Sequence, residues 1–142
     1  MQISLRLGEF GWSDLDLWLE DTHHNFSITH IFNSPMKEIA RAIFELHHGA
    51  SESTFTLYEE PGHHVWTMSQ VADAQPLLLV EIKPYEGTIL EFQVERKFFV
   101  ESFLVELNKI ALQLGYPRFS KNRTPEEFPL ASLQDFDSEM PS

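Results

Sequence analysis

Two segments near the N-terminus alternate hydrophobic with polar positions. Isoleucine and leucine occupy every second position within residues 2–8, and leucines do so again within residues 12–21. A period of two is typical of a strand that buries one face and exposes the other. The polar residues 21–25 predict a turn after the second strand, and the alternation resumes at Phe26. We therefore expect this part of the chain to form two strands, a turn and a third strand.

A helical pattern follows in residues 34–49, where apolar residues recur three or four positions apart. Ser34 is suited to cap the N-terminus of this helix, and Pro35 fits its first turn, where the missing N–H costs nothing. Gly49 stands where a left-handed residue commonly ends a helix. The pattern thus predicts one helix with a defined start and end.

Four further strand patterns occupy the middle of the chain: TFTLY, HHVWTMS, PLLLVEIK and TILEFQVE. Between the first two, residues 60–63 predict a type II turn, because proline fixes φ at the second position and glycine supplies a positive φ at the third. In the strand that follows, His63 and His64 are expected to point to opposite faces, and Trp66 to pack on the same face as His64.

A second helix is predicted over residues 99–114, where phenylalanine, leucine and isoleucine follow one another at four-residue spacing. Gly115 and Pro117 end this pattern, since glycine suits a helix end and proline prevents continuation. Apolar residues between 120 and 136 are expected to fold back onto the body, and residues 137–142 to form a frayed tail.

These elements predict an α+β fold in a single domain that spans residues 1–136. We expect one antiparallel, strongly twisted sheet of about six to seven strands, with two long helices packed on one face. The apolar stripes of the helices would supply one half of the core. The inward faces of the strands would supply the other half.

Composition narrows the class of partner. The chain of 142 residues contains no cysteine and carries 22 acidic residues against 10 basic ones, for a net charge of −12. This charge repels phosphate backbones and anionic lipids, so we expect neither nucleic-acid nor membrane binding. The same field attracts a basic protein and speeds its encounter. The first ten residues show no signal-peptide pattern, and we expect a cytoplasmic protein.

Histidine is the one residue type that invites a metal hypothesis. Six of the seven histidines form adjacent pairs, His23–His24, His47–His48 and His63–His64. Neighbouring residues on a strand diverge, and no pair shows the helical spacing that puts two imidazoles on one ion. The catalytic and phosphate-binding motifs are also absent from the sequence. We expect no catalytic, cofactor-binding or metal-ligating residue, and no enzymatic activity.

Four short motifs carry a resemblance to a known group of proteins: Gly11–Trp12, Glu60–Pro61–Gly62, Trp66 and Phe128–Pro129. Their order along the chain resembles that of a large group of small uncharacterised bacterial proteins. Several such groups are similar to immunity proteins, which neutralise the toxins of competing bacteria. The resemblance implies a role in binding another protein and implies no catalytic residue.

We therefore predict a non-catalytic, acidic protein-binding domain of the immunity type that docks on a basic partner. Its contact residues are predicted to be Asp14, Asp16 and Trp18 on the outer face of an early strand, with Glu59 and Glu60 at a hairpin tip. Two alternatives stay open at this point. One is a homodimeric structural or scaffolding domain, and the other is a small enzyme or metal-dependent protein whose site the sequence does not reveal.

Overall fold

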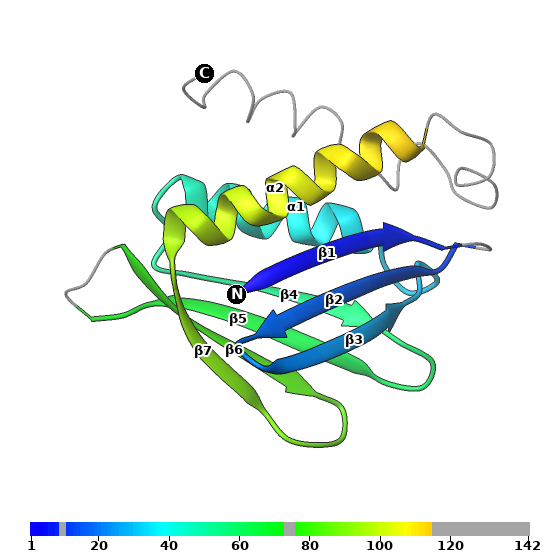
Figure 1. The fold of residues 1–142 in the computed structure, drawn as a ribbon, viewed down its shortest axis with the longest axis horizontal. Helices are drawn as coiled ribbons and strands as arrows, with labels where there is room; N and C mark the ends of the chain where they lie inside the picture. Colours follow the sequence, from blue (N-terminus) through cyan, green and yellow to red (C-terminus); the bar gives the residue numbers. More distant parts are fainter. Residues whose placement is uncertain (9–10, 73–75, 115–142) are drawn as a thin grey trace.

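The computed structural model describes residues 1–8, 11–72 and 76–114 (Figure 1). The elements in chain order are β1 (Gln2–Leu7), β2 (Ser13–Leu19), β3 (Thr22–Ile28), α1 (Pro35–His47), β4 (Glu52–Tyr58), β5 (His63–Gln70), β6 (Leu77–Pro84), β7 (Leu90–Glu95) and α2 (Arg96–Gln113). The fold is α+β, as the patterns predicted. The predicted end of the second helix and the expected contacts and tail of residues 120–142 lie outside the described residues.

The seven strands form two antiparallel sheets, so the prediction of one continuous sheet is wrong. One sheet has the order β1-β2-β3 and the other β4-β5-β6-β7. Among the described residues, one isolated pair, Thr29 with Tyr58, links them, with the Thr29 N–H donating to the Tyr58 carbonyl at 2.9 Å. Sheet pairing stops there because the chain leaves β3 through an irregular segment and α1 before β4 begins. The two sheets therefore cross, and each buries one face against the other (Figure 1).

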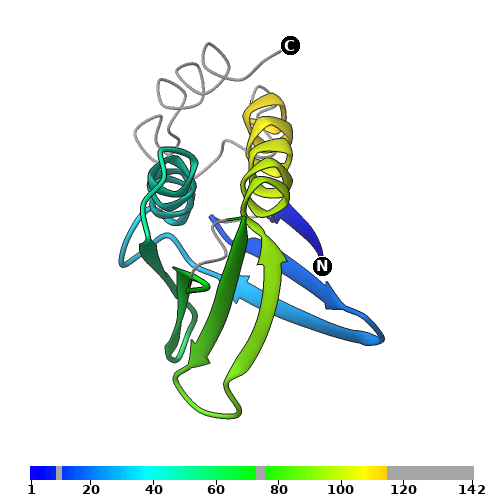
Figure 2. The same cartoon turned by 90° about the vertical axis from the view of Figure 1, so that its left-hand side faces the viewer.

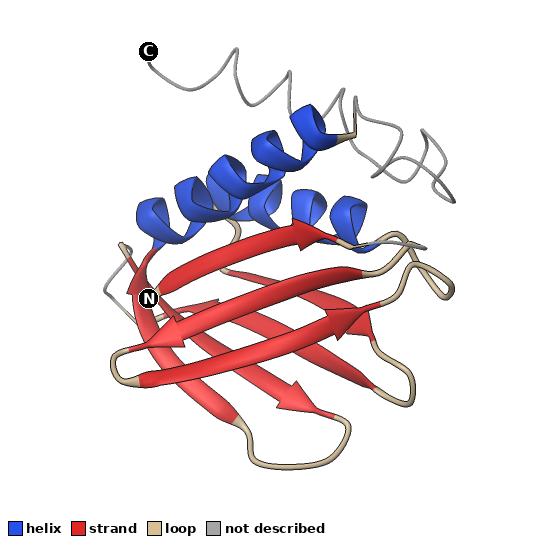
Figure 3. Ribbon diagram, turned by 45° about the vertical axis from the view of Figure 1, so that its right-hand side comes forward, coloured by secondary structure: helices blue, strands red, loops and turns tan. Residues whose placement is uncertain are grey.

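Both helices lie on the same side of the pair of sheets (Figure 2). Helix α1 packs on β4, α2 packs on β1 and β7, and the two helices contact each other (Figure 3). The edge of β1 is also tied to α2, because the backbone N–H of Leu5 donates to the Glu106 carboxylate at 2.9 Å. The helices thus cover the end of the molecule where the two sheets diverge. In the described residues, no helix is long and apolar enough to cross a membrane.

The strand alternation places side chains as predicted. Leu15 and Leu17 on β2 are fully buried, and so are Trp66 and Met68 on β5. The ring of Phe103, from α2, meets the Trp66 ring edge-on with centroids 5.8 Å apart. The core therefore lies between the sheets and beneath the helices, and the opposite strand faces are mostly exposed or half-buried, although Asp16 is buried there.

The predicted turn at residues 21–25 is right only at Asp21, because residues 22–25 belong to β3. The β2–β3 hairpin turns tightly at Glu20 and Asp21, where Glu20 has a φ of 51°. The polar side chains of β3 face outward and pair across to β2, so they do not need to be in a turn. A run of polar residues on the exposed face of a half-buried hairpin is indistinguishable from a loop by composition alone.

The start of α1 lies where predicted, with Ser34 at the N-cap position and Pro35 as the first helical residue, but the Ser34 side chain makes no capping hydrogen bond to the helix. Gly49 has a φ of +90°, the left-handed conformation expected after the helix. Helix α2 begins three residues earlier than expected, at Arg96, directly after β7. The Arg96 guanidinium anchors this junction by donating to the Leu46 and Ala50 carbonyls at 2.9 and 2.8 Å.

Candidate functional site

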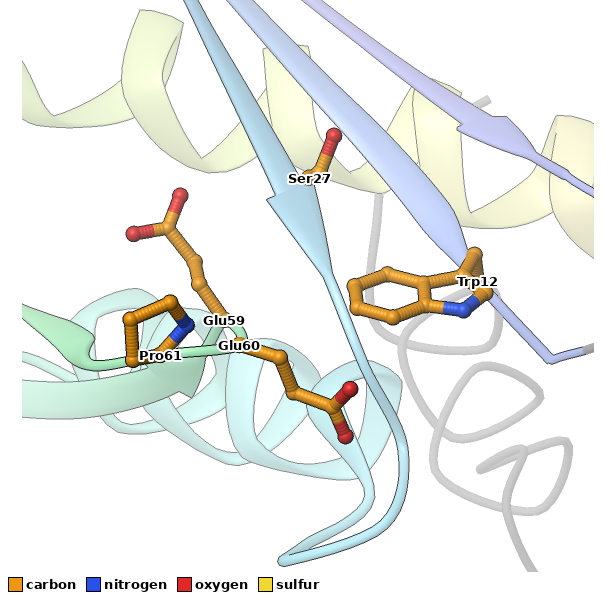
Figure 4. Close-up of a pocket in the computed structure, with 5 residues that line it drawn as sticks. All are labelled: Trp12, Ser27, Glu59, Glu60 and Pro61. Atoms are coloured by element: carbon orange, nitrogen blue, oxygen red, sulfur yellow. The ribbon is translucent and has the colours of Figure 1, made fainter.

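A pocket of about 500 Å³ opens where three distant segments meet (Figure 4). Trp12 comes from the loop before β2, Ser27 from β3, and Glu59, Glu60 and Pro61 from the β4–β5 turn. Figure 4 shows the Glu60 carboxylate turned toward the side where Trp12 lies, while the Glu59 carboxylate turns away from Glu60. The pocket therefore combines one aromatic wall with two carboxylates.

A glycine and a histidine fix the loop that carries Trp12. Gly11 has a φ of +85°, and its carbonyl accepts a hydrogen bond from His30 Nδ1 at 2.8 Å. A Cβ atom on residue 11 would lie 1.8 Å from His30 Cε1, so no larger residue fits without moving the ring. The Gly8 N–H closes the loop by donating to the Trp12 carbonyl at 2.8 Å. Gly11 is thus required for both its backbone conformation and its contact with His30.

The β4–β5 turn that carries the carboxylates differs from the predicted type II turn. Tyr58 and His63 form the last strand pair, so the loop consists of residues 59–62. The peptide bond between Glu60 and Pro61 is cis, and the Glu59 N–H donates to the Gly62 carbonyl at 3.0 Å. In a loop of residues 59–62, Pro61 stands at the third position and not at the second, where a type II turn places proline. The expected positive φ of Gly62 is confirmed, at +99°.

Behind the pocket lies a buried histidine with no hydrogen bond. His64 has an exposed fraction of 0%, and neither of its ring nitrogens has a hydrogen-bond partner among the described residues. Its Nδ1 lies 3.7 Å from Glu59 Oε2, beyond hydrogen-bond distance, and its ring stacks on Phe26 with centroids 4.2 Å apart. Burial, together with repulsion from His63, lowers the pKa of His64 to about 4. Burial also raises the pKa of Glu59.

Asp16 lies in a different environment, on the outer face of the β1-β2-β3 sheet. Its side chain is only 5% exposed, because Arg6 and His23 reach it from the two flanking strands at 2.8 Å and Asn25 at 3.0 Å. Burial alone would raise the pKa of Asp16, but the hydrogen bonds from Asn25, His23 and Arg6 outweigh it and the pKa is lowered. Trp18 is half-buried and stacks on His23, with centroids 4.7 Å apart.

The five residues predicted to bind a partner therefore fall into two groups. Glu59 and Glu60 line the pocket, and Asp14 borders it, since the Ser27 hydroxyl donates to Asp14 Oδ1 at 3.3 Å. Asp16 and Trp18 instead make their contacts with neighbouring side chains of the sheet. The sequence placed all five on an acidic surface, but it could not reveal which carboxylates already have partners.

Sequence reasoning missed a row of aromatic rings beside the pocket. Phe32 and Tyr85 are 63% and 64% exposed, with Tyr58 and His63 between them. Successive ring centroids are 5.3 Å apart from Phe32 to Tyr58, 5.9 Å from Tyr58 to His63 and 5.6 Å from His63 to Tyr85. We call these four residues the aromatic row. Large aromatic residues inside loop segments were the available signal, at positions 32 and 85.

The histidine pairs do not gather. Among residues 1–8, 11–72 and 76–114, no group of three or more histidine, aspartate or glutamate side chains is arranged to hold a metal ion. His63 and His64 lie on opposite faces of β5, as predicted. His47 and His48 lie at the end of α1, where His48 Nδ1 is 2.9 Å from the Phe44 carbonyl.

Comparisons of the chain with protein families, with curated proteins and with solved structures found no match.

Proposed function

We propose that the protein is a non-catalytic binding protein that docks on a basic protein through the aromatic row and the adjoining pocket. The observation that carries this proposal is the exposure of Phe32 and Tyr85 at the two ends of the aromatic row, whose middle members Tyr58 and His63 flank the turn that carries Glu59 and Glu60. Exposed aromatic side chains of this kind anchor protein interfaces, because they bury a large area with few rotatable bonds. The aromatic row supplies such anchors on one end of the molecule.

Charge favours a basic partner over an acidic or neutral one. The net charge of −12 sets up a negative field, and Asp14, Glu59 and Glu60 add local charge at this end. In the described part of the chain, no lysine or arginine forms an ion pair with Glu59 or Glu60. A second copy of this chain would bring like charges together, which opposes a homodimer through this end. The immunity-type role that the resemblance implies fits a basic toxin as the partner.

The proposed anchor residues differ from Trp18, the anchor predicted from the sequence. Trp18 is occupied by its stack on His23, whereas Phe32 and Tyr85 present most of their surface to solvent. An anchor gains affinity from the apolar surface that it buries on binding. The aromatic row therefore replaces Trp18 as the proposed source of affinity, while the carboxylates set the rate and orientation of association.

The test begins with capture of a partner from the native cell and continues with surface-plasmon kinetics on the purified pair. Phe32→Ala and Tyr85→Ala should each speed dissociation by about tenfold, as expected for anchor residues. Phe98→Ala is the matched control, because Phe98 is 48% exposed on α2, away from the aromatic row. An acidic partner, or equal effects of all three substitutions, would contradict the proposal.

A further inference from the structure

The pocket in Figure 4 has the composition of a site for one organic cation. Trp12, Glu59 and Glu60 line it, with the Glu60 carboxylate turned toward the side where Trp12 lies, and Ser27 connects the pocket to a third carboxylate, Asp14. Cations are attracted both to the face of an indole and to carboxylates, and the two attractions add when they act on one group. Within the described residues, no lysine or arginine forms an ion pair with Glu59 or Glu60.

The buried imidazole next to Glu59 shows that this carboxylate is not engaged by a hydrogen bond from His64. Buried polar groups in folded proteins are nearly always hydrogen-bonded. His64 is fully buried, its two nitrogens are unpartnered, and its Nδ1 faces Glu59 across 3.7 Å. Glu59 is thus a carboxylate with an unsatisfied imidazole on one side and the pocket on the other. A cation in the pocket would keep Glu59 ionised, which is the form that accepts a hydrogen bond from the imidazole best.

We propose that this pocket binds the guanidinium group of one arginine side chain of the partner, between the Trp12 indole and the Glu60 carboxylate, with Glu59 adding negative charge at the pocket wall. The assignment rests on the proposed function and adds to it the chemical group that is recognised. The aromatic row then supplies the apolar part of the interface, and the pocket supplies its charge-specific contact.

Arginine fits these residues better than lysine or a metal ion does. Guanidinium is planar, stacks on aromatic rings and donates two parallel hydrogen bonds to a carboxylate, whereas ammonium is a compact, strongly hydrated point charge. A metal ion would require three or four ligand atoms at about 2.0–2.6 Å, and no such group exists in the described residues. The volume of about 500 Å³ leaves room for the aliphatic stem of an arginine as well as its head.

The test uses N-acetyl-arginine amide as the probe and needs no partner. Its matched control is N-acetyl-citrulline amide, which has nearly the same shape but no charge. In an NMR titration of the full chain, the arginine probe should bind with a dissociation constant on the order of 1 mM. The shifts should include the Trp12 indole N–H and the amides of Glu60 and Gly62, and the citrulline probe should bind at least about fivefold more weakly.

Two substitutions of equal charge separate the pocket from the general acidity of the chain. Glu60→Gln should weaken the arginine probe about fivefold, because it removes a carboxylate from the pocket. Glu52→Gln should leave the affinity unchanged, since Glu52 is exposed at the opposite end of β4. Both side chains are exposed, so both variants should fold.

Equal binding of the two probes, equal effects of the two substitutions, or shifts confined to the Asp16 side of the sheet would overturn the inference. These outcomes differ from a failure of the proposed function. A basic partner that needs the aromatic row but ignores Glu60→Gln would overturn only the arginine site. Probe binding that meets the expectations above would support the arginine site even if the captured partner proved acidic.

Discussion

Two acidic regions of this molecule differ in how their carboxylates are satisfied. Asp16, on the outer face of the β1-β2-β3 sheet, accepts hydrogen bonds from Arg6, His23 and Asn25, and its pKa is lowered. Within the described residues, Glu59 at the β4–β5 turn forms no ion pair with a lysine or arginine; the His64 imidazole lies 3.7 Å from its carboxylate, and its pKa is raised. The first carboxylate is satisfied within its sheet, and the second is one that we propose for contact with a ligand.

The two carboxylates carry the same charge, so the difference shows that the position of a carboxylate relative to a strand pair decides which hydrogen bonds it receives. Asp16 is the middle residue of the middle strand, directly opposite Ser4 on one side and Asn25 on the other. Side chains from both neighbours therefore converge on it. Glu59 has left the ladder, so it has no cross-strand partner on either side, and a turn position leaves its charge to solvent and to the pocket.

The core beneath both regions should give the largest effect on stability. Phe103 is fully buried and contacts the rings of Phe55, Trp66 and Phe99, with centroids 6.1, 5.8 and 5.0 Å away. Phe103→Ala should lower the free energy of unfolding by about 3–5 kcal/mol, because it leaves a cavity among rigid rings. Urea denaturation measures this directly. A loss below about 1 kcal/mol would mean that the core tolerates the missing ring by collapsing.

The unpartnered histidine should make the pocket region sensitive to acid. His64 has a pKa of about 4 in the folded protein against 6.5 for an unperturbed histidine. The unfolded chain therefore binds the proton first, so the stabilisation is complete above about pH 6.5 and is lost as the pH falls toward 4. The expected loss reaches about 3 kcal/mol. His63 adds repulsion, and Glu59 acts in the opposite direction, because its raised pKa makes the folded state take up its proton more readily.

Urea denaturation at about pH 7 and about pH 4.5 checks this expectation, with His64→Leu as the comparison. The variant should be at least as stable at neutral pH, since it removes a buried polar group that lacks a partner. It should also lose less stability on acidification than the unsubstituted protein. Equal acid sensitivity in the two proteins would mean that other groups cause it.

Local features of this fold were readable from the sequence, whereas long-range ones were not. The alternation of Leu15 and Leu17 with Asp14 and Asp16 set the two faces of β2, because the side-chain period of a strand is a local property. Which strands share a sheet depends on pairing between distant segments. The hydrophobic pattern does not indicate that, within the described residues, Thr29 and Tyr58 form the backbone pair between the two sheets.

The site was readable only in part, for the same reason. Trp12 and Glu60 both belong to motifs noted in the sequence, but no pattern shows that two loops so far apart form one pocket. His23 and Asn25 looked like turn residues because their partner, Asp16, lies on the neighbouring strand. A polar residue can be assigned to a loop or to an exposed strand face only when its hydrogen-bond partner is known.

Separate replacement of Asp16 and Glu60 tests whether the two kinds of carboxylate differ in their contribution to stability. Asp16→Ala should lower the free energy of unfolding by about 1.5–3 kcal/mol, because three donors lose their charged acceptor. Glu60→Ala should change it by less than about 0.5 kcal/mol, since Glu60 is exposed and unpaired in the described residues. Thermal and urea denaturation of both variants provide the measurement. Equal losses would abolish the distinction between a structural and an available carboxylate.

The smallest expected effect, in free energy, concerns the rate of association with a basic partner. Asp14 is half-buried beside the pocket and, within the described residues, makes one long hydrogen bond, from the Ser27 hydroxyl at 3.3 Å. Asp14→Lys should slow association about threefold to tenfold at low salt and leave the fold intact, because exposed charges act mainly through steering. Raising the salt should shrink this difference, since charges are screened over about 10 Å at 0.1 M.

Asp16→Lys should instead destabilise the fold, because it would place a second cation beside Arg6. Stopped-flow kinetics at two salt concentrations, together with a urea melt of each variant, separate the two residues. If Asp14→Lys destabilised the protein as much as Asp16→Lys, or left the association rate unchanged at low salt, Asp14 would belong with Asp16 among the structural carboxylates.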